Sequence, residues 1–129
     1  MKIKDQVLSI NQVQELQELG FDVEKHANMC WFEQTPFAPI EQPKKYELEI
    51  LTDSLIGNRG NLDVIPTLTI GDIMECLPKE IEENELNIFV FGETWSVGWE
   101  DIRYYGSNTL IDALFKTLKW CIKEKHIEL

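Results

Sequence analysis

The chain has few basic residues and few cysteines, and no long apolar run. Lysine and arginine number 12 against 23 aspartates and glutamates, which gives a formal net charge of −11 over 129 residues. Because proteins bind a DNA or RNA backbone through cationic side chains that neutralise phosphates, this balance argues against direct nucleic-acid binding. No apolar segment approaches the roughly 20 residues that a membrane span needs, so we expect no membrane association.

The cysteines are too few and too widely spaced to define a covalent framework. Cys30, Cys76 and Cys121 are odd in number and lie far apart in the chain. Their spacing fits neither a set of disulfides nor a zinc site. The N-terminal segment is charged and lacks the apolar stretch and cleavage site of a secretory signal. We therefore expect reduced thiols in a cytoplasmic protein.

The chain does contain enough apolar material for a core. Hydrophobic residues make up 43% of its 129 residues, which is typical of a folded chain and not of a disordered one. This length suits one domain. We expect a single compact domain over residues 1–129.

Three segments carry the cap residues and apolar stripes of helices. Ser9 is followed by a capping-box glutamine, and Thr69 by an aspartate that suits the positive end of the helix dipole. The third helix begins at Ser107 or Thr109, with Thr109 the better cap, and it has the longest apolar stripe. These signals predict two short helices and a long C-terminal one.

Four segments have the apolar or alternating pattern of strands, and a fifth, 102–105, extends the sheet. The four segments are 29–32, 46–50, 86–91 and 94–99. Residues 52–64 are rich in glycine and asparagine, which predicts a loop. The mixed order and the hairpin-type connections predict an α+β fold. We expect an antiparallel sheet of about four to five strands and three helices, with the long C-terminal helix packed on one sheet face.

Two segments resemble stretches found in a group of small proteins. Residues 65–78 and 110–127, with the strand 95–99 between them, resemble recurring segments of small uncharacterised α+β proteins of bacteriophages and bacterial mobile elements, a group with no established function. The matching residues are helix caps and core positions. The resemblance therefore implies a fold and a bacterial or phage setting, with the protein in the bacterial cytoplasm or, if phage-encoded, in the host cytoplasm. It implies nothing about catalysis.

Acidic residues concentrate in one part of the sequence. Between residues 72 and 101 the only basic side chain is Lys79, against nine acids. Such a run can be an ordinary solvated face, or it can be a surface shaped for a basic partner. The candidate protein-binding residues are Glu80, Glu82, Glu83, Glu85, Glu100 and Asp101.

Three functions are compatible with this pattern. The leading hypothesis is a non-enzymatic accessory protein that binds a protein with a basic surface, steered by the acidic residues. A second is an inhibitor of a nucleic-acid-binding protein, such as an anti-defence factor, whose carboxylates imitate phosphates. A third is a small-ligand-binding domain or small enzyme. The lysine-bearing C-terminal helix also leaves open a homodimer with the acidic face of a second copy.

The third hypothesis depends on Trp95 and Trp99, which share one face of a predicted strand. Two such rings can form a stacking platform for a ligand. They can equally pack beneath the long C-terminal helix, where large aromatic side chains are usually found.

Catalytic signals are weak elsewhere. His26 and Cys30 are close in sequence, but nucleophilic catalysis needs a base in contact with the thiol and a third group to orient that base. Glu100 and Asp101 are neighbours whose side chains should diverge, and the acidic run lacks the spacing of a calcium loop. We predict no catalytic residues, no cofactor and no metal.

Overall fold

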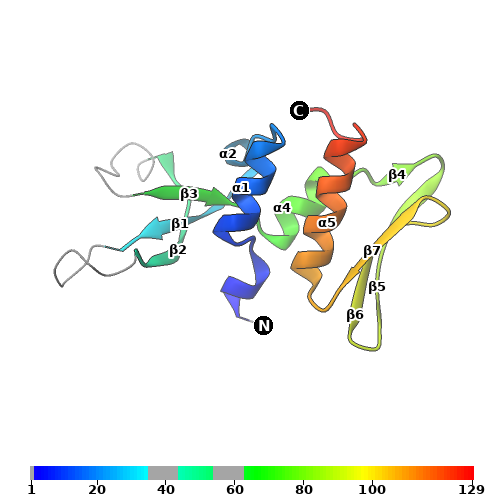
Figure 1. Cartoon of the computed structure of the whole chain (residues 1–129), viewed down its shortest axis with the longest axis horizontal. Coiled ribbons are helices and arrows are strands. Elements are labelled where there is room, and N and C mark those ends of the chain that lie inside the picture. The colour runs from blue at the N-terminus through cyan, green and yellow to red at the C-terminus, as the bar shows by residue number, and fades with distance from the viewer. Residues whose placement is uncertain (1, 35–43, 54–62) are drawn as a thin grey trace.

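The computed structural model describes residues 2–34, 44–53 and 63–129 (Figure 1). Its helices and strands, in chain order, are η1 (Ile3–Gln6), α1 (Ile10–Glu18), α2 (Val23–His26), β1 (Met29–Glu33), β2 (Tyr46–Ile50), β3 (Val64–Thr67), α4 (Ile70–Cys76), β4 (Glu80–Ile81), β5 (Asn84–Phe91), β6 (Thr94–Trp99), β7 (Arg103–Ser107) and α5 (Leu110–Lys123). The predicted α+β class is confirmed.

The strands form two antiparallel sheets. The first sheet has the order β2-β1-β3, and the second sheet has the order β4-β5-β6-β7. Figure 1 shows α1, α4 and α5 between the two sheets. The sequence pattern indicated one sheet. The strands instead form two, because α4 carries the chain from the end of β3 across to β4. Helix α5 packs against β6 and β7, which confirms the predicted position of the long C-terminal helix on a sheet face.

The core lies between the helices and the inner face of the second sheet. Among its completely buried side chains are Leu8, Leu16, Leu68, Ile73, Val97, Trp99, Leu114 and Leu118. Burying one side chain of this size contributes about 1.5–3 kcal/mol. The core therefore joins α1, α4, α5 and β6 by contacts that are distant in sequence.

Side-chain caps begin the three longest helices where the sequence predicts them. The hydroxyl of Ser9 accepts a hydrogen bond from the backbone N–H of Gln12 at 3.2 Å, and the Gln12 side chain accepts one from the N–H of Ser9 at 3.0 Å. Thr69 and Asp72 form the equivalent pair at α4, at 3.1 and 3.0 Å. Thr109 caps α5, which decides between its two possible starts. Each cap satisfies backbone N–H groups that have no partner within the helix.

Polar contacts also join α1 to α5. The Gln12 amide donates to the Asp112 carboxylate at 2.8 Å, and Lys119 lies 3.6 Å from Glu15. Because Gln12 also belongs to the cap of α1, one side chain both starts this helix and fixes its position against α5.

Three short elements, η1, α2 and β4, were not predicted from the sequence. The predicted loop at 52–64 also needs a correction. Residues 54–62 of that segment lie outside the described part of the chain, but β3 begins at Val64. Pro66 lies within β3 and faces Cys30 of β1 in the ladder. A proline lacks a backbone N–H but is tolerated in an edge strand, and β3 is at the edge of the first sheet.

Candidate protein-binding surface

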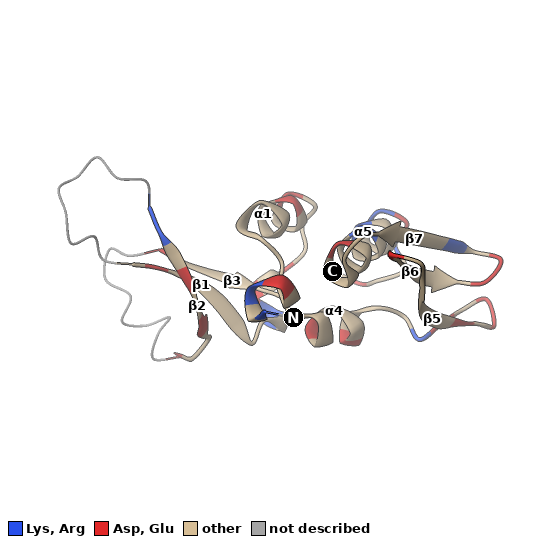
Figure 2. Ribbon diagram, turned by 90° about the horizontal axis from the view of Figure 1, so that it is seen from below, with Lys and Arg blue, Asp and Glu red and all other residues tan. Residues whose placement is uncertain are grey.

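The predicted acidic residues come together at one end of the second sheet. Leu86 of β5 is paired with Trp99 of β6, so the turn before β5 and the turn after β6 project from the same end. These turns carry Glu82–Glu83 and Glu100–Asp101, and Figure 2 shows both in red at that end of the molecule. We call the set Glu80, Glu82, Glu83, Glu85, Glu100 and Asp101 the acidic end.

The backbone of the acidic end is unusual for its residue types. Glu82, Glu83 and Asp101 have φ values of 49°, 72° and 62°. Residues other than glycine rarely adopt this left-handed region. The two-residue turn at Glu82–Glu83 has positive φ at both positions, a geometry in which Asn-Gly is strongly preferred. Local stability alone therefore does not account for two glutamates there.

Like charges also face each other across the strands at the acidic end. Glu80 of β4 is paired directly with Glu85 of β5, and both side chains are exposed. Directly opposite charges of one sign destabilise a pair of strands. A cationic partner would relieve this repulsion.

Aromatic side chains lie on the outer face of the second sheet, along β5 from its middle to the end opposite the acidic end. Along β5, Leu86 and Ile88 point toward the core, so Glu85, Phe89 and Phe91 lie on the opposite face. Phe91 is 83% exposed and Phe89 is 46% exposed. These two, with Tyr104 of β7, form what we call the aromatic patch.

Two members of the aromatic patch, Phe89 and Tyr104, are in contact with each other. The rings of Phe89 and Tyr104 meet edge to face with centroids 5.4 Å apart, and the Asn87 amide donates to the Tyr104 hydroxyl at 3.3 Å. At Gly98, a Cβ atom would lie 1.9 Å from the carbonyl oxygen of Arg103, so no side chain fits. The backbone of Arg103 and Tyr104 therefore covers Gly98, which is buried, beside the paired rings of Phe89 and Tyr104.

Sequence reasoning missed the aromatic patch. The run Leu86–Phe91 is almost continuously apolar, so alternation could not show that one of its two faces is exposed. Tyr104 lay in a segment predicted only to extend the sheet. Exposed aromatic side chains that gather on one face mark an interaction surface more often than scattered ones do.

The two tryptophans of the predicted ligand face have different surroundings. Trp99 is completely buried, its indole N–H donates to the carbonyl of Pro78 at 3.1 Å, and its ring centroid lies 5.9 Å from that of Trp120. It offers no surface to a ligand in this structure. Trp95 is partly exposed and packs against the same core. The pair therefore does not form an open platform.

The thiols are held in their protonated form. Burial raises the pKa of Cys121 to about 12 and that of Cys76 to about 11, from an ordinary value of 9.0. Burial, and then the charge of Glu49, raises the pKa of Cys30. The imidazole of His26 stacks on Phe21 with centroids 5.2 Å apart. Because the thiolate is the nucleophile, these environments do not activate a cysteine at neutral pH.

A polar cluster of Glu33, Lys44, Tyr46 and Asp63 joins the strand ends of the first sheet, and we call it the clamp. Lys44 lies 3.0 Å from the carboxylate of Asp63 and 3.5 Å from that of Glu33. The Tyr46 hydroxyl donates to Asp63 at 3.0 Å, and the backbone N–H of Asp63 donates to Glu33 at 2.8 Å. Hydrogen bonding to Asp63 raises the pKa of Lys44, so this amine stays protonated and is a poor general base. The cluster ties β1 to the ends of β2 and β3.

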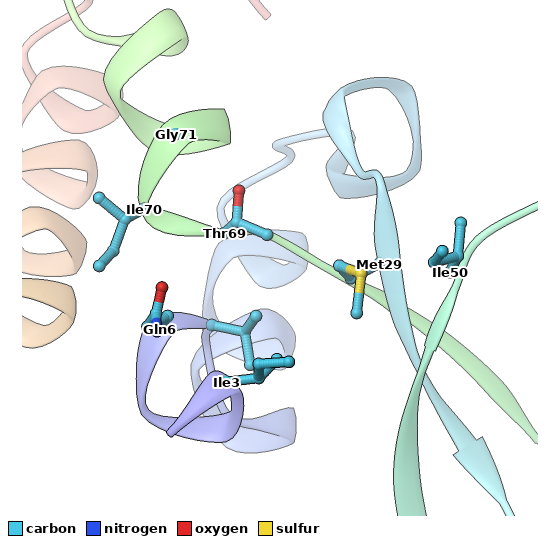
Figure 3. A pocket seen from close by; sticks show the side chains of 8 residues that line it. Ile3, Gln6, Met29, Ile50, Thr69, Ile70 and Gly71 are labelled. Atoms are coloured by element: carbon cyan, nitrogen blue, oxygen red, sulfur yellow. The ribbon is translucent and has the colours of Figure 1, made fainter. Parts of the chain in front are cut away.

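One hollow lies between the N-terminal segment and the first sheet, with a volume of about 440 Å³. Figure 3 shows Ile3, Met29, Ile50 and Thr69 around it. Its lining is mostly apolar, and the Thr69 hydroxyl already accepts the cap hydrogen bond of α4. Ligand sites combine apolar walls with several converging polar groups, and this hollow has few.

Comparisons with known proteins assign no family. No protein-family model matches the chain, and no curated protein or solved structure matches it either. Within residues 2–34, 44–53 and 63–129, no helix is long and apolar enough to cross a membrane. In the same ranges no group of three or more His, Cys, Asp or Glu side chains is placed to hold a metal ion.

Proposed function

We propose that the chain is a non-enzymatic protein-binding module that uses the acidic end and the aromatic patch as one surface. The observation that supports this is their shared face: Glu85, Asn87, Phe89 and Phe91 follow one another along the outer face of β5, from the acidic end to the opposite end of the strand. Protein interfaces combine a few buried aromatic anchors with a polar rim. The aromatic patch suits the anchors, and the acidic end suits the rim.

The partner that we propose is complementary to this surface. A complementary protein would present apolar side chains to Phe89 and Phe91 and lysine or arginine side chains to the acidic end. Charge complementarity of this kind raises the association rate and makes it depend on salt. Binding to such a partner would also offset the repulsion between Glu80 and Glu85.

The cellular setting forms part of this proposal. The resemblance of residues 65–78 and 110–127 to segments of phage and mobile-element proteins supports an accessory role in a bacterial cytoplasm.

Inhibition of a nucleic-acid-binding protein is the second candidate. The two acidic turns lie beside each other at one end of the sheet, so their carboxylates could occupy a groove that otherwise holds phosphates. In that case the partner loses DNA or RNA when it binds this chain. A partner that keeps its nucleic acid in a saturated complex would leave only the first candidate.

The experiment begins with capture of partners by the tagged chain from a bacterial lysate at low and high salt. A purified partner is then tested against the variant Glu82→Lys/Glu83→Lys. The matched control is Glu47→Lys/Glu49→Lys, which changes the net charge equally at exposed positions on the first sheet. We expect the first variant to associate roughly tenfold more slowly and with a flatter salt dependence. Equal association rates for the two variants would refute the proposal.

A further inference from the structure

The outer face of the second sheet offers side chains, and no backbone groups, to a partner. The helices of the chain lie on the other side of this sheet (Figure 1). Residues Trp95–Trp99 of β6 are paired with β5 on one side and with β7 on the other. An extended segment laid on this face would therefore displace water without finding partners for its own N–H and C=O groups. A helix binds such a face at lower cost, because it satisfies its backbone internally.

The acidic end and the aromatic patch together form a strip, and its size matches one helix. Along β5, six residue steps separate Glu85 from Phe91, which is about 20 Å of strand. Across the sheet, β5 and β7 are two strand spacings apart, or about 10 Å. A helix is about 10 Å across, and about 13 residues of it cover the same length as the strip.

Charge distinguishes the two ends of this strip. The two turns at the acidic end carry four carboxylates, whereas the turn at the other end of β5 carries one, that of Glu93. Among the described residues, no cation forms an ion pair with the acidic end. Two basic residues border it, but the Lys79 ammonium donates to the carbonyl of Met74, and the Arg103 guanidinium lies over the Tyr105 ring. The negative charge is therefore left for a partner.

We infer that the partner docks as an amphipathic helix of about 13 residues along β5, with its N-terminus at the acidic end. This inference rests on the proposed function. The first N–H groups of a helix carry a partial positive charge and lack partners within the helix. Carboxylates of the acidic end would accept them, as Asp22 accepts the N–H of Lys25 at the start of α2. Lysine or arginine side chains in the first turn would strengthen this contact, and apolar side chains on one face of the later turns would cover the aromatic patch.

The opposite direction of this helix is disfavoured. The last carbonyl groups of a helix carry a partial negative charge, and they would then face the four turn carboxylates of the acidic end. At the other end of the strip they meet the uncharged side chains of Phe91 and Thr94, with the single carboxylate of Glu93 in the turn between them. The two ends of the strip therefore select one direction.

Two synthetic peptides of one composition test this inference. Both are stapled helices, and circular dichroism checks that they are equally helical. The first has lysines in its first turn and leucines on one face of its later turns, and the second has the reverse order. Isothermal titration calorimetry against the purified chain should give a dissociation constant about tenfold lower for the first peptide.

Variants of the chain place the first peptide on the strip. Phe91→Ser and Glu82→Lys/Glu83→Lys should each weaken its binding about tenfold. The matched control Glu47→Lys/Glu49→Lys should leave its dissociation constant within about twofold, because those charges lie on the first sheet and are screened. Circular dichroism checks that all variants fold like the wild type.

Four results would overturn the helix. The second peptide binds as tightly as the first; an unstapled copy of the first peptide with a central proline binds as tightly; the first peptide does not bind at millimolar concentration; or Phe91→Ser and Glu82→Lys/Glu83→Lys leave its binding unchanged. If a captured protein partner remains sensitive to those two variants, only the helix is refuted. If the captured partner is also insensitive to them, the proposed function fails as well.

Discussion

The two sheets of this protein are built differently. In the first sheet, opposite charges meet at the strand ends, where Lys44 lies between Glu33 and Asp63. In the second sheet, Glu80 faces Glu85, and two glutamates occupy a turn that favours Asn-Gly. The first sheet thus has stabilising ion pairs at its strand ends, whereas the second sheet has several features that lower stability, all on one surface. Departures of this kind tend to gather where a protein functions.

The largest effect on stability is expected inside the second sheet, at Gly98. An added Cβ would lie 1.9 Å from the Arg103 carbonyl oxygen, so Gly98→Ala must push β7 away from β6. We expect the free energy of unfolding to fall by about 3 kcal/mol in urea denaturation. Gly71→Ala in α4 is the control, because its nearest neighbour would lie 3.8 Å away and alanine favours a helix. Equal losses at the two glycines would contradict the close approach of β7.

The next effect tests the clamp of the first sheet. Glu33 is buried and accepts the N–H of Asp63 at 2.8 Å. Glu33→Ala leaves that donor without its acceptor, and we expect a loss of about 2 kcal/mol in the free energy of unfolding. Glu47→Ala, at an exposed position of β2, should change stability by less than about 0.5 kcal/mol. A loss at Glu33 no larger than that of the control would show that the clamp does not stabilise the sheet.

The acidic turn should respond in the opposite direction. The double variant Glu82→Asn/Glu83→Gly places the preferred residues in a turn with positive φ at both positions. We expect it to gain about 1 kcal/mol in thermal or urea unfolding while it weakens binding to a basic partner. A less stable double variant would mean that the glutamates are there for the fold, and the contrast between the sheets would disappear.

The smallest effect on stability is expected at the aromatic patch. Phe91 is 83% exposed, so Phe91→Ser should change the free energy of unfolding by less than about 0.5 kcal/mol. The same variant should weaken partner capture measured against the wild type. A large loss of stability would instead place Phe91 in a contact needed for folding.

Local signals predicted the helices well. The caps at Ser9, Thr69 and Thr109 depend on residues three positions apart, which a sequence displays directly. The α+β class followed from the order of elements. The division into two sheets did not, because strand partners are chosen by contacts across the whole chain. Pro66 also concealed β3, since proline argues against a strand unless the edge position is known.

The candidate surface was predicted only in part. The sequence pointed to the acidic residues, but their position at one end of the second sheet depends on the pairing of Leu86 with Trp99. The aromatic patch was missed, because an apolar run does not show which face a helix covers. Trp99 was considered for a ligand face, and its burial depends on the distant carbonyl of Pro78 and on Trp120.

The most direct test of the contrast between the sheets is a nuclear magnetic resonance titration of the ¹⁵N-labelled chain with a captured partner. Amide signals should shift or broaden at residues 82–91 and 100–104, at the acidic end and the aromatic patch. Signals from β1, β2 and β3 should stay unchanged. Shifts confined to the first sheet would contradict the account, because the surface that departs from the rules of stability would then not be the one that binds.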